Sequence, residues 1–142
     1  MKKQALRVLI MLSLFVTLAV ASVHAQFDGQ IAANIPFEFI VGKTTLPAGE
    51  YTVEPLRTAP GLLIRSVDSR ACVMVLTNSV QASAIQAKAK LVFNRYGDQY
   101  FLSQVWTPGD YIGRELIRSR HELELAKSTP KPQTATLMGQ KR

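Results

Sequence analysis

Short stretches in which apolar and polar residues alternate, separated by turn residues, make up most of the chain. This is the pattern of half-buried β-strands. The clearest unit is K-L-V-F-N-R-Y-G-D-Q-Y-F-L-S-Q-V-W, residues 90–106. Gly97-Asp98 predicts a two-residue hairpin loop there, because glycine accepts the positive φ that such turns require. Pairing of Tyr96 with Gln99 then places the predicted core residues on one face: Ala89, Leu91, Phe93, Leu102 and Trp106.

A second hairpin is predicted over residues 62–76, with its turn at Asp68-Ser69, whose short side chains can bond to the local backbone. This register sets Ile64 against Val73 on one face. The opposite face is also apolar, so we expect the pair to be covered on both sides or to be central in its sheet. Its residues are Leu63, Cys72 and Met74. The Cys72 thiol is accordingly expected to be a small buried hydrophobic group.

The stretch V-G-K-T-T-L-P-A-G-E-Y-T-V, residues 41–53, contains a G-K-T that invites comparison with a phosphate-binding loop. Such a loop needs a further glycine five residues earlier, so that backbone N–H groups can curl round the phosphate. That position is Phe37, and T-T-L-P-A-G cannot form the helix that would follow. We interpret the stretch instead as a hairpin bent at Gly42-Lys43, followed by a P-A-G turn and a returning strand through Tyr51.

The pattern changes toward the C-terminus. Residues 78–88 keep neither period and are expected to form a connecting loop. Pro108 and Gly109 end the last predicted strand, and the apolar and charged residues of 113–127 are typical of an amphipathic helix. Residues 128–142 have no apolar period and are expected to be disordered.

Together these patterns predict one mainly all-β domain over residues 26–112, followed by a C-terminal helix. We expect an antiparallel β-sandwich or a partly closed barrel of roughly six to eight strands between Phe27 and Trp106, with the sandwich favoured over the barrel.

The first 25 residues are predicted to be a secretory signal peptide. Basic residues precede an uncharged apolar run over residues 8–23, and small side chains at Val23 and Ala25 fit a cleavage site before Gln26. The run has 16 residues, fewer than the roughly 20 of a membrane-spanning helix. Export to the periplasm or beyond is therefore expected, with no membrane span after cleavage.

Charge is distributed unevenly along the chain. Of the 17 basic and 10 acidic residues, three basic ones lie in the predicted signal peptide. Residues 26–113 hold seven of each sign, so the basic excess lies in the last 29 residues and is attributed to a tail rather than to a binding face. The neutral body lacks the clustered Lys and Arg that contact phosphates, which disfavours nucleic acid as a partner.

Four blocks carry a resemblance to known proteins: I-P-F-E-F-I-V-G, L-P-A-G-E-Y-T-V, K-L-V-F-N-R-Y-G-D-Q-Y-F-L and G-R-E-L, in this order between Asn34 and Lys127. In this combination the chain resembles a group of small exported bacterial β-rich proteins of unknown function. The resemblance implies export and a β-rich fold, and it assigns a role to no residue.

Groups that carry out catalysis or bind metals are scarce. Cys72 is the only cysteine and His121 the only histidine after the signal peptide, so neither an intramolecular disulfide nor a metal site of His and Cys is expected, and no cofactor is predicted. His121, in R-S-R-H-E, is interpreted as a surface residue. A hydrolase-like enzyme with paired carboxylates remains an alternative, and its candidate residues are Glu38, Glu50, Glu54, Asp98 and Asp110.

Aromatic residues gather between positions 96 and 111, and four of them are candidate binding residues for a sugar or a peptide: Tyr96, Tyr100, Phe101 and Tyr111. In the predicted hairpin, Tyr96 and Phe101 point away from the core. We therefore expect them to be covered by the C-terminal helix or by another molecule.

These observations favour a non-enzymatic binding or structural module of the cell envelope over the hydrolase-like alternative. The partners to be expected are an envelope protein, a glycan or a second copy of the chain.

Overall fold

The computed structural model describes residues 29–141, so the predicted signal peptide lies outside the described residues. Ten strands and one helix follow one another within these residues. Their bounds are β1 (Ile31–Ile35), β2 (Phe39–Val41), β3 (Thr44–Leu46), β4 (Gly49–Pro55), β5 (Gly61–Ser66), β6 (Cys72–Gln81), β7 (Ala89–Tyr96), β8 (Gln99–Trp106), β9 (Ile112–Leu116), α2 (Arg120–Ser128) and β10 (Gln133–Lys141).

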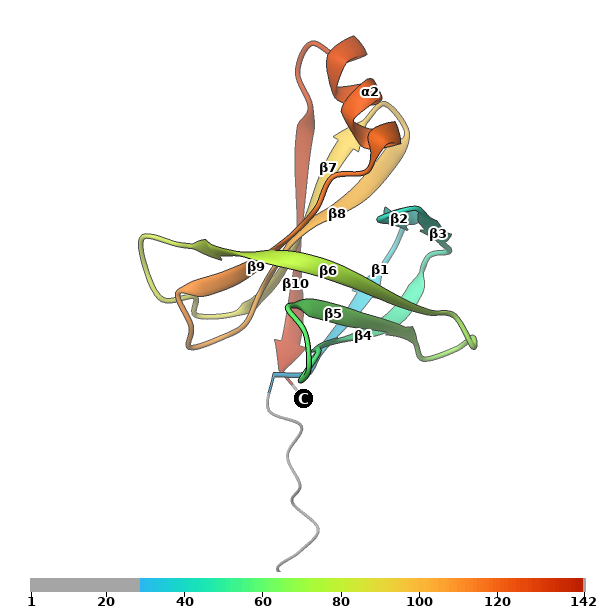
Figure 1. The fold of residues 1–142 in the computed structure, drawn as a ribbon. Helices are drawn as coiled ribbons and strands as arrows, with labels where there is room; N and C mark the ends of the chain where they lie inside the picture. Colours follow the sequence, from blue (N-terminus) through green and yellow to red (C-terminus); the bar gives the residue numbers. More distant parts are fainter. Residues whose placement is uncertain (1–28, 142) are drawn as a thin grey trace, which may run out of the picture.

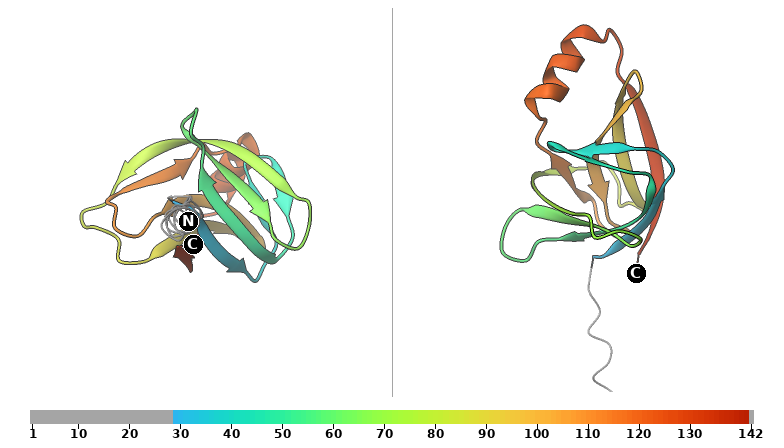
Figure 2. Two further views of the ribbon diagram at one scale, coloured as in Figure 1. Left: turned by 90° about the horizontal axis from the view of Figure 1, so that it is seen from below. Right: turned by 90° about the vertical axis from the view of Figure 1, so that its right-hand side faces the viewer.

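Eight of the strands close into an antiparallel barrel in the order β8-β7-β10-β1-β4-β5-β6-β9, and pairing of β9 with β8 completes the ring. The β2–β3 hairpin extends the sheet from β8, to which β2 is parallel at Ile40 and Phe101. The helix α2 stands at one end of the molecule (Figures 1 and 2). The mainly all-β prediction is confirmed. Of the two architectures expected, the structure has the barrel, and the ring is complete.

The predicted hairpins are present. Tyr96 pairs with Gln99 across the Gly97-Asp98 turn, where Gly97 has a φ of 63°. Ile64 pairs with Val73 in the second hairpin. These turns form where they were expected because Gly97 accepts a positive φ, and because the Ser66 and Ser69 hydroxyls accept hydrogen bonds from the N–H groups of Ser69 and Ala71.

The predicted bend at Gly42-Lys43 is confirmed, but β2 pairs there with β3, whereas the predicted returning strand through Tyr51, β4, pairs with β1 and β5. Val41 pairs with Thr44, and Gly42 between them has a φ of 61°. After the P-A-G turn, the Tyr51 hydroxyl donates a hydrogen bond to the Pro47 carbonyl at 2.6 Å and ties the turn to β4.

Trp106 does not share the core face of β8, in contrast to the prediction. The register of β7 and β8 shifts between Val92 and Phe93, so Lys90 rather than Ala89 lies opposite Trp106. Such a bulge turns the following side chains to the other face. Trp106 is still buried, because its ring lies against Gly113 of β9, where an added Cβ would come within 2.6 Å of the ring.

The second face of the β5–β6 hairpin is not covered, so the first of the two expected arrangements is wrong. The second is confirmed, because both strands are central in the sheet, between β4 and β9. Met74 is 67% exposed, and Cys72 is exposed rather than buried. The hairpin belongs to the barrel wall, which has one face toward the core and one toward solvent. Apolar side chains on the outer face of a strand therefore do not show that another layer of the protein covers that face.

Three predictions for the later part of the chain were wrong in their bounds or their structure. Residues 78–81, expected to be loop, continue β6 and pair with β9. The expected helix over 113–127 is the strand β9 followed by α2. The expected disordered segment 128–142 contains β10, which pairs with β7 and β1 and closes the barrel. Its inward side chains, Ala135 and Leu137, pack on the core. The outward Met138 is apolar and 62% exposed, so it interrupts the alternation of apolar and polar residues.

Large side chains fill the barrel, so the interior is a packed core. The largest of them that are almost completely buried are Phe39, Tyr51, Phe93, Ile31, Ile35, Leu62, Ile64 and Leu91. In the part of the chain that the structure describes, no helix has the length and apolar character needed to cross a membrane.

Candidate functional site

The four aromatic candidates do not form one binding surface. Tyr96 and Phe101 lie on the outer face of the β7–β8 hairpin, but they are only 4% and 2% exposed. Tyr100 stacks on Phe37 with 3.9 Å between ring centroids and belongs to the edge of the core. Tyr111 is 46% exposed in the loop before β9. These positions do not support a stacking platform for a sugar or a peptide.

Tyr96 and Phe101 are covered by α2, the first of the two coverings expected. Their rings meet edge to face at 5.7 Å, and the His121 ring lies 5.9 Å from that of Phe101. The helix begins here because Ser119 accepts a hydrogen bond from the Glu122 N–H at 3.2 Å and so caps its N-terminus.

Glu122 links α2 to the β7–β8 hairpin through hydrogen bonds. Its side chain is buried, and Oε1 accepts hydrogen bonds from the Tyr96 hydroxyl and from Asn94 Nδ2, both at 3.2 Å. The role of Glu122 in positioning α2 was not predicted from the sequence. The signal was the pattern S-R-H-E, in which a serine cap is followed three residues later by glutamate, a common beginning of a helix.

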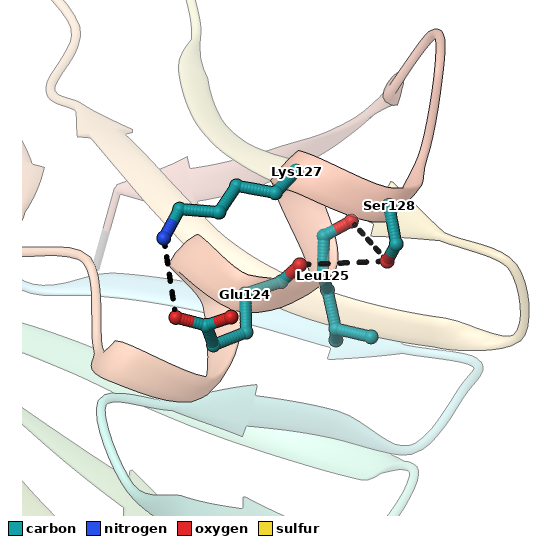
Figure 3. A network of polar contacts seen from close by, with 4 residues as sticks. All are labelled: Glu124, Leu125, Lys127 and Ser128. Carbon is teal, nitrogen blue, oxygen red and sulfur yellow. Dashed lines mark hydrogen bonds and ion pairs between the residues drawn. The ribbon is translucent and has the colours of Figure 1, made fainter.

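The C-terminal end of α2 is stabilised by polar contacts within its last turn (Figure 3). The Ser128 hydroxyl lies within hydrogen-bonding distance of the carbonyl oxygens of Glu124 and Leu125, at 3.4 and 3.1 Å. Lys127 Nζ lies 3.3 Å from Glu124 Oε1. The Thr129 N–H then bonds to the Leu125 carbonyl, and the chain leaves the helix toward β10.

We expect stability to fall above about pH 10 because of two buried phenols. Burial, and then the Glu122 carboxylate, raise the pKa of Tyr96 above its usual value of 10.0. Burial, and then Asp68, raise the pKa of Tyr51. The unfolded chain loses these protons first, so the stability contribution is complete below pH 10 and is lost as the pH rises through the folded-state values. Urea unfolding from neutral pH to about pH 11 measures this loss.

Tyr96→Phe provides the control for this prediction. The variant lacks the hydrogen bond to Glu122 and should be less stable at neutral pH, but its stability should decline less at alkaline pH. An equally steep alkaline decline in both proteins would show that Tyr96 does not contribute to it.

The carboxylates proposed for a hydrolase-like site are distributed over several elements. Glu38, Glu50 and Asp98 line three different cavities. Glu54 lies 4.0 Å from Arg65 on the neighbouring strand, and Asp110 accepts a hydrogen bond from the Ile112 N–H at its turn. Within residues 29–141, no three His, Cys, Asp or Glu residues are grouped so that they could hold a metal ion.

The largest of these cavities is a cleft of about 590 Å³ between the β2–β3 hairpin and the N-terminus of α2, which we call the hairpin–helix cleft. This size lies within the range of small-molecule sites. Its lining residues are Glu38, Ile40, Gly42, Lys43, Thr45, Gln99, Ser119, Arg120 and His121.

The walls of the hairpin–helix cleft are positioned by regular structure. Ile40 and Thr45 pair across β2 and β3 and therefore share a face of that hairpin. On the opposite side, His121 Nε2 lies 3.1 Å from Gln99 Oε1, which joins α2 to the start of β8. The surface-residue interpretation of His121 is confirmed by its exposure, and the same residue lines the cleft.

Sequence reasoning did not find this cleft, because its residues are neighbours only in the folded chain. Lys43 was interpreted as a turn residue, and Arg120 as part of a solvated helix. Comparison with protein-family models, characterised proteins and solved structures found no match for the chain.

Proposed function

We propose that the protein is an exported, non-enzymatic binding module of the cell envelope and that the hairpin–helix cleft is its binding site. The cleft is the observation that supports this proposal, because it is a concave surface of ligand size whose polar groups come from the β2–β3 turn, β3, the start of β8 and the N-terminus of α2. A closed barrel supplies a rigid base for such a site. An envelope protein, a glycan or a second copy of the chain remain its candidate partners.

The hydrolase-like alternative is less well supported. Glu38 is the only acidic residue among those that line the cleft, and paired-carboxylate catalysis needs two. His121 is joined to the amide of Gln99 and not to a carboxylate that would orient it as a general base.

Binding at the cleft can be tested by filling it. Thr45→Trp places a large side chain on a residue that lines the cleft, whereas Thr44→Trp changes the adjacent exposed residue, which does not. We expect fragments of envelope glycans and peptides to shift NMR signals of cleft residues in the native protein and in Thr44→Trp, and not in Thr45→Trp. Shifts that map elsewhere, or that persist in Thr45→Trp, would argue against this site.

Export is supported by the N-terminal sequence pattern and by the resemblance to exported proteins. The mass of the protein recovered from the cell envelope or the medium should correspond to a chain that begins at Gln26. Recovery of the full chain in the cytoplasm alone would contradict export and leave the binding test unaffected.

A further inference from the structure

We infer that the hairpin–helix cleft binds small organic anions, with the charged group of the ligand between Lys43 and the first turn of α2. This inference rests on the proposed function, which places a binding site in the cleft, and adds the chemical class of the ligand. Three observations support the inference. The lining residues are mostly basic where they are charged, they come from both the β2–β3 hairpin and α2, and an apolar surface lies beside them.

Basic groups face the cleft from both of its sides. Lys43 comes from the turn between β2 and β3, and Arg120 and His121 come from the start of α2. Glu38 is the one acidic lining residue, so the cleft carries a net positive charge even when His121 is neutral. Two cations on opposite walls favour a ligand whose negative charge lies between them.

The charged groups of Lys43 and Arg120 are available to bind a ligand. In the described chain, 29–141, the ion pairs within 4.0 Å are Arg65–Glu54 and Lys127–Glu124, and neither involves Lys43 or Arg120. Both side chains are exposed, so an approaching anion does not have to displace an existing partner. Arg120 can in addition hold a carboxylate or a phosphate through two parallel hydrogen bonds.

The backbone supports the same charge preference. Arg120 and His121 occupy the first two positions of α2, where N–H groups have no partner within the helix. The Glu122 N–H is already taken by Ser119. The partial positive charge at this end of the helix adds to that of the side chains.

The basic residues of the last part of the chain, attributed to a tail, lie in part on α2, which holds Arg120 and Lys127. Glu122 and Glu124 balance their charge on the helix as a whole. The preference for an anion therefore depends on which side chains line the cleft, and these include Arg120 but neither glutamate.

An apolar part of the ligand is expected as well. Ile40 is half-buried on the wall of the cleft. A short hydrocarbon chain attached to the anion would cover this surface and gain from its removal from water.

Four six-carbon probes with different head groups test the inference: hexanoate, hexyl phosphate, hexylammonium and hexanol. Titration of the mature protein, followed by NMR, should show that the two anions shift signals of cleft residues at lower concentrations than hexanol, and that hexylammonium binds most weakly. The ratio of the two anion affinities distinguishes a carboxylate site from a phosphate site.

Matched variants assign the effect to the cleft. Arg120→Gln and Lys43→Gln should each weaken binding of the preferred anion about fivefold, as expected for partly solvated ion pairs. Arg118→Gln removes an equal charge from an exposed residue that does not line the cleft, and it should leave the affinity unchanged.

The inference would be overturned by equal or stronger binding of hexylammonium or hexanol at the cleft, by equal losses in Arg118→Gln and Arg120→Gln, or by no binding of either anion. The first of these results leaves the proposed function in place, because a ligand still occupies the cleft. The proposed function fails separately, if Thr45→Trp does not prevent binding of envelope fragments.

Discussion

Deletion of residues 130–142 is expected to unfold the protein. The deletion removes β10, which pairs with β7 from Gln133 to Gly139 and with β1 at Ile31 and Ala32 (Figure 1). Both neighbouring strands would then have an unpaired edge, and the core would lose Ala135 and Leu137. A loss of this kind is comparable with the whole stability of a small domain, about 5–15 kcal/mol. Loss of chemical-shift dispersion and binding of a hydrophobic dye would report it.

Addition of the missing strand provides the control for the deletion. A synthetic peptide with the sequence of residues 130–142 should insert between β1 and β7 and restore the native NMR spectrum, since main-chain pairing with an open sheet edge is a known mode of peptide binding. A deletion variant that is fully folded without the peptide would show that β10 is not needed to close the barrel.

Phe93→Ala is expected to lower the free energy of unfolding by about 3–5 kcal/mol, as large truncations in a core do. Phe93 is 0% exposed, and its ring contacts those of Phe37 and Phe39 edge to face at 5.1 and 5.7 Å. The cavity left behind is bordered by rigid strands that cannot close it. Denaturant unfolding monitored by circular dichroism measures the difference.

Val92→Ala is the matched comparison for Phe93→Ala. Val92 is the preceding residue of β7 and points to the opposite, partly solvated face. Its truncation should cost about 1 kcal/mol or less. Equal losses in the two variants would mean that the inward and outward faces of β7 have been assigned incorrectly.

Elements whose shape is determined by neighbouring residues could be predicted from the sequence. Gly97-Asp98 and Gly42-Lys43 favour tight turns through their own backbone preferences, so both bends were predicted, and the pairing of Tyr96 with Gln99 was predicted as well. The shift at Val92 and Phe93 has no comparable sequence signal, because a bulge depends on the strands that surround it. Trp106 was for this reason assigned to the wrong face.

Barrel closure could not be predicted, because it depends on pairing between distant parts of the chain. The stretch T-A-T-L-M-G alternates only from Thr134 to Leu137, because the outward Met138 is apolar and Gly139 has no side chain. The hairpin–helix cleft could not be predicted for the same reason. Lys43 and Arg120 lie far apart in the sequence, and their proximity follows from the docking of α2 through Glu122.

The pairing of β1 with β10 also has a kinetic consequence. Ile31 lies opposite Lys141, so the first and last strands of the described chain must meet before the ring is complete. Contacts of such large sequence separation require a costly loop closure and are associated with slow folding. During synthesis, the ribosome must deliver β10 before the barrel can close. The nascent chain therefore stays open, with exposed strand edges, until translation of this segment has ended.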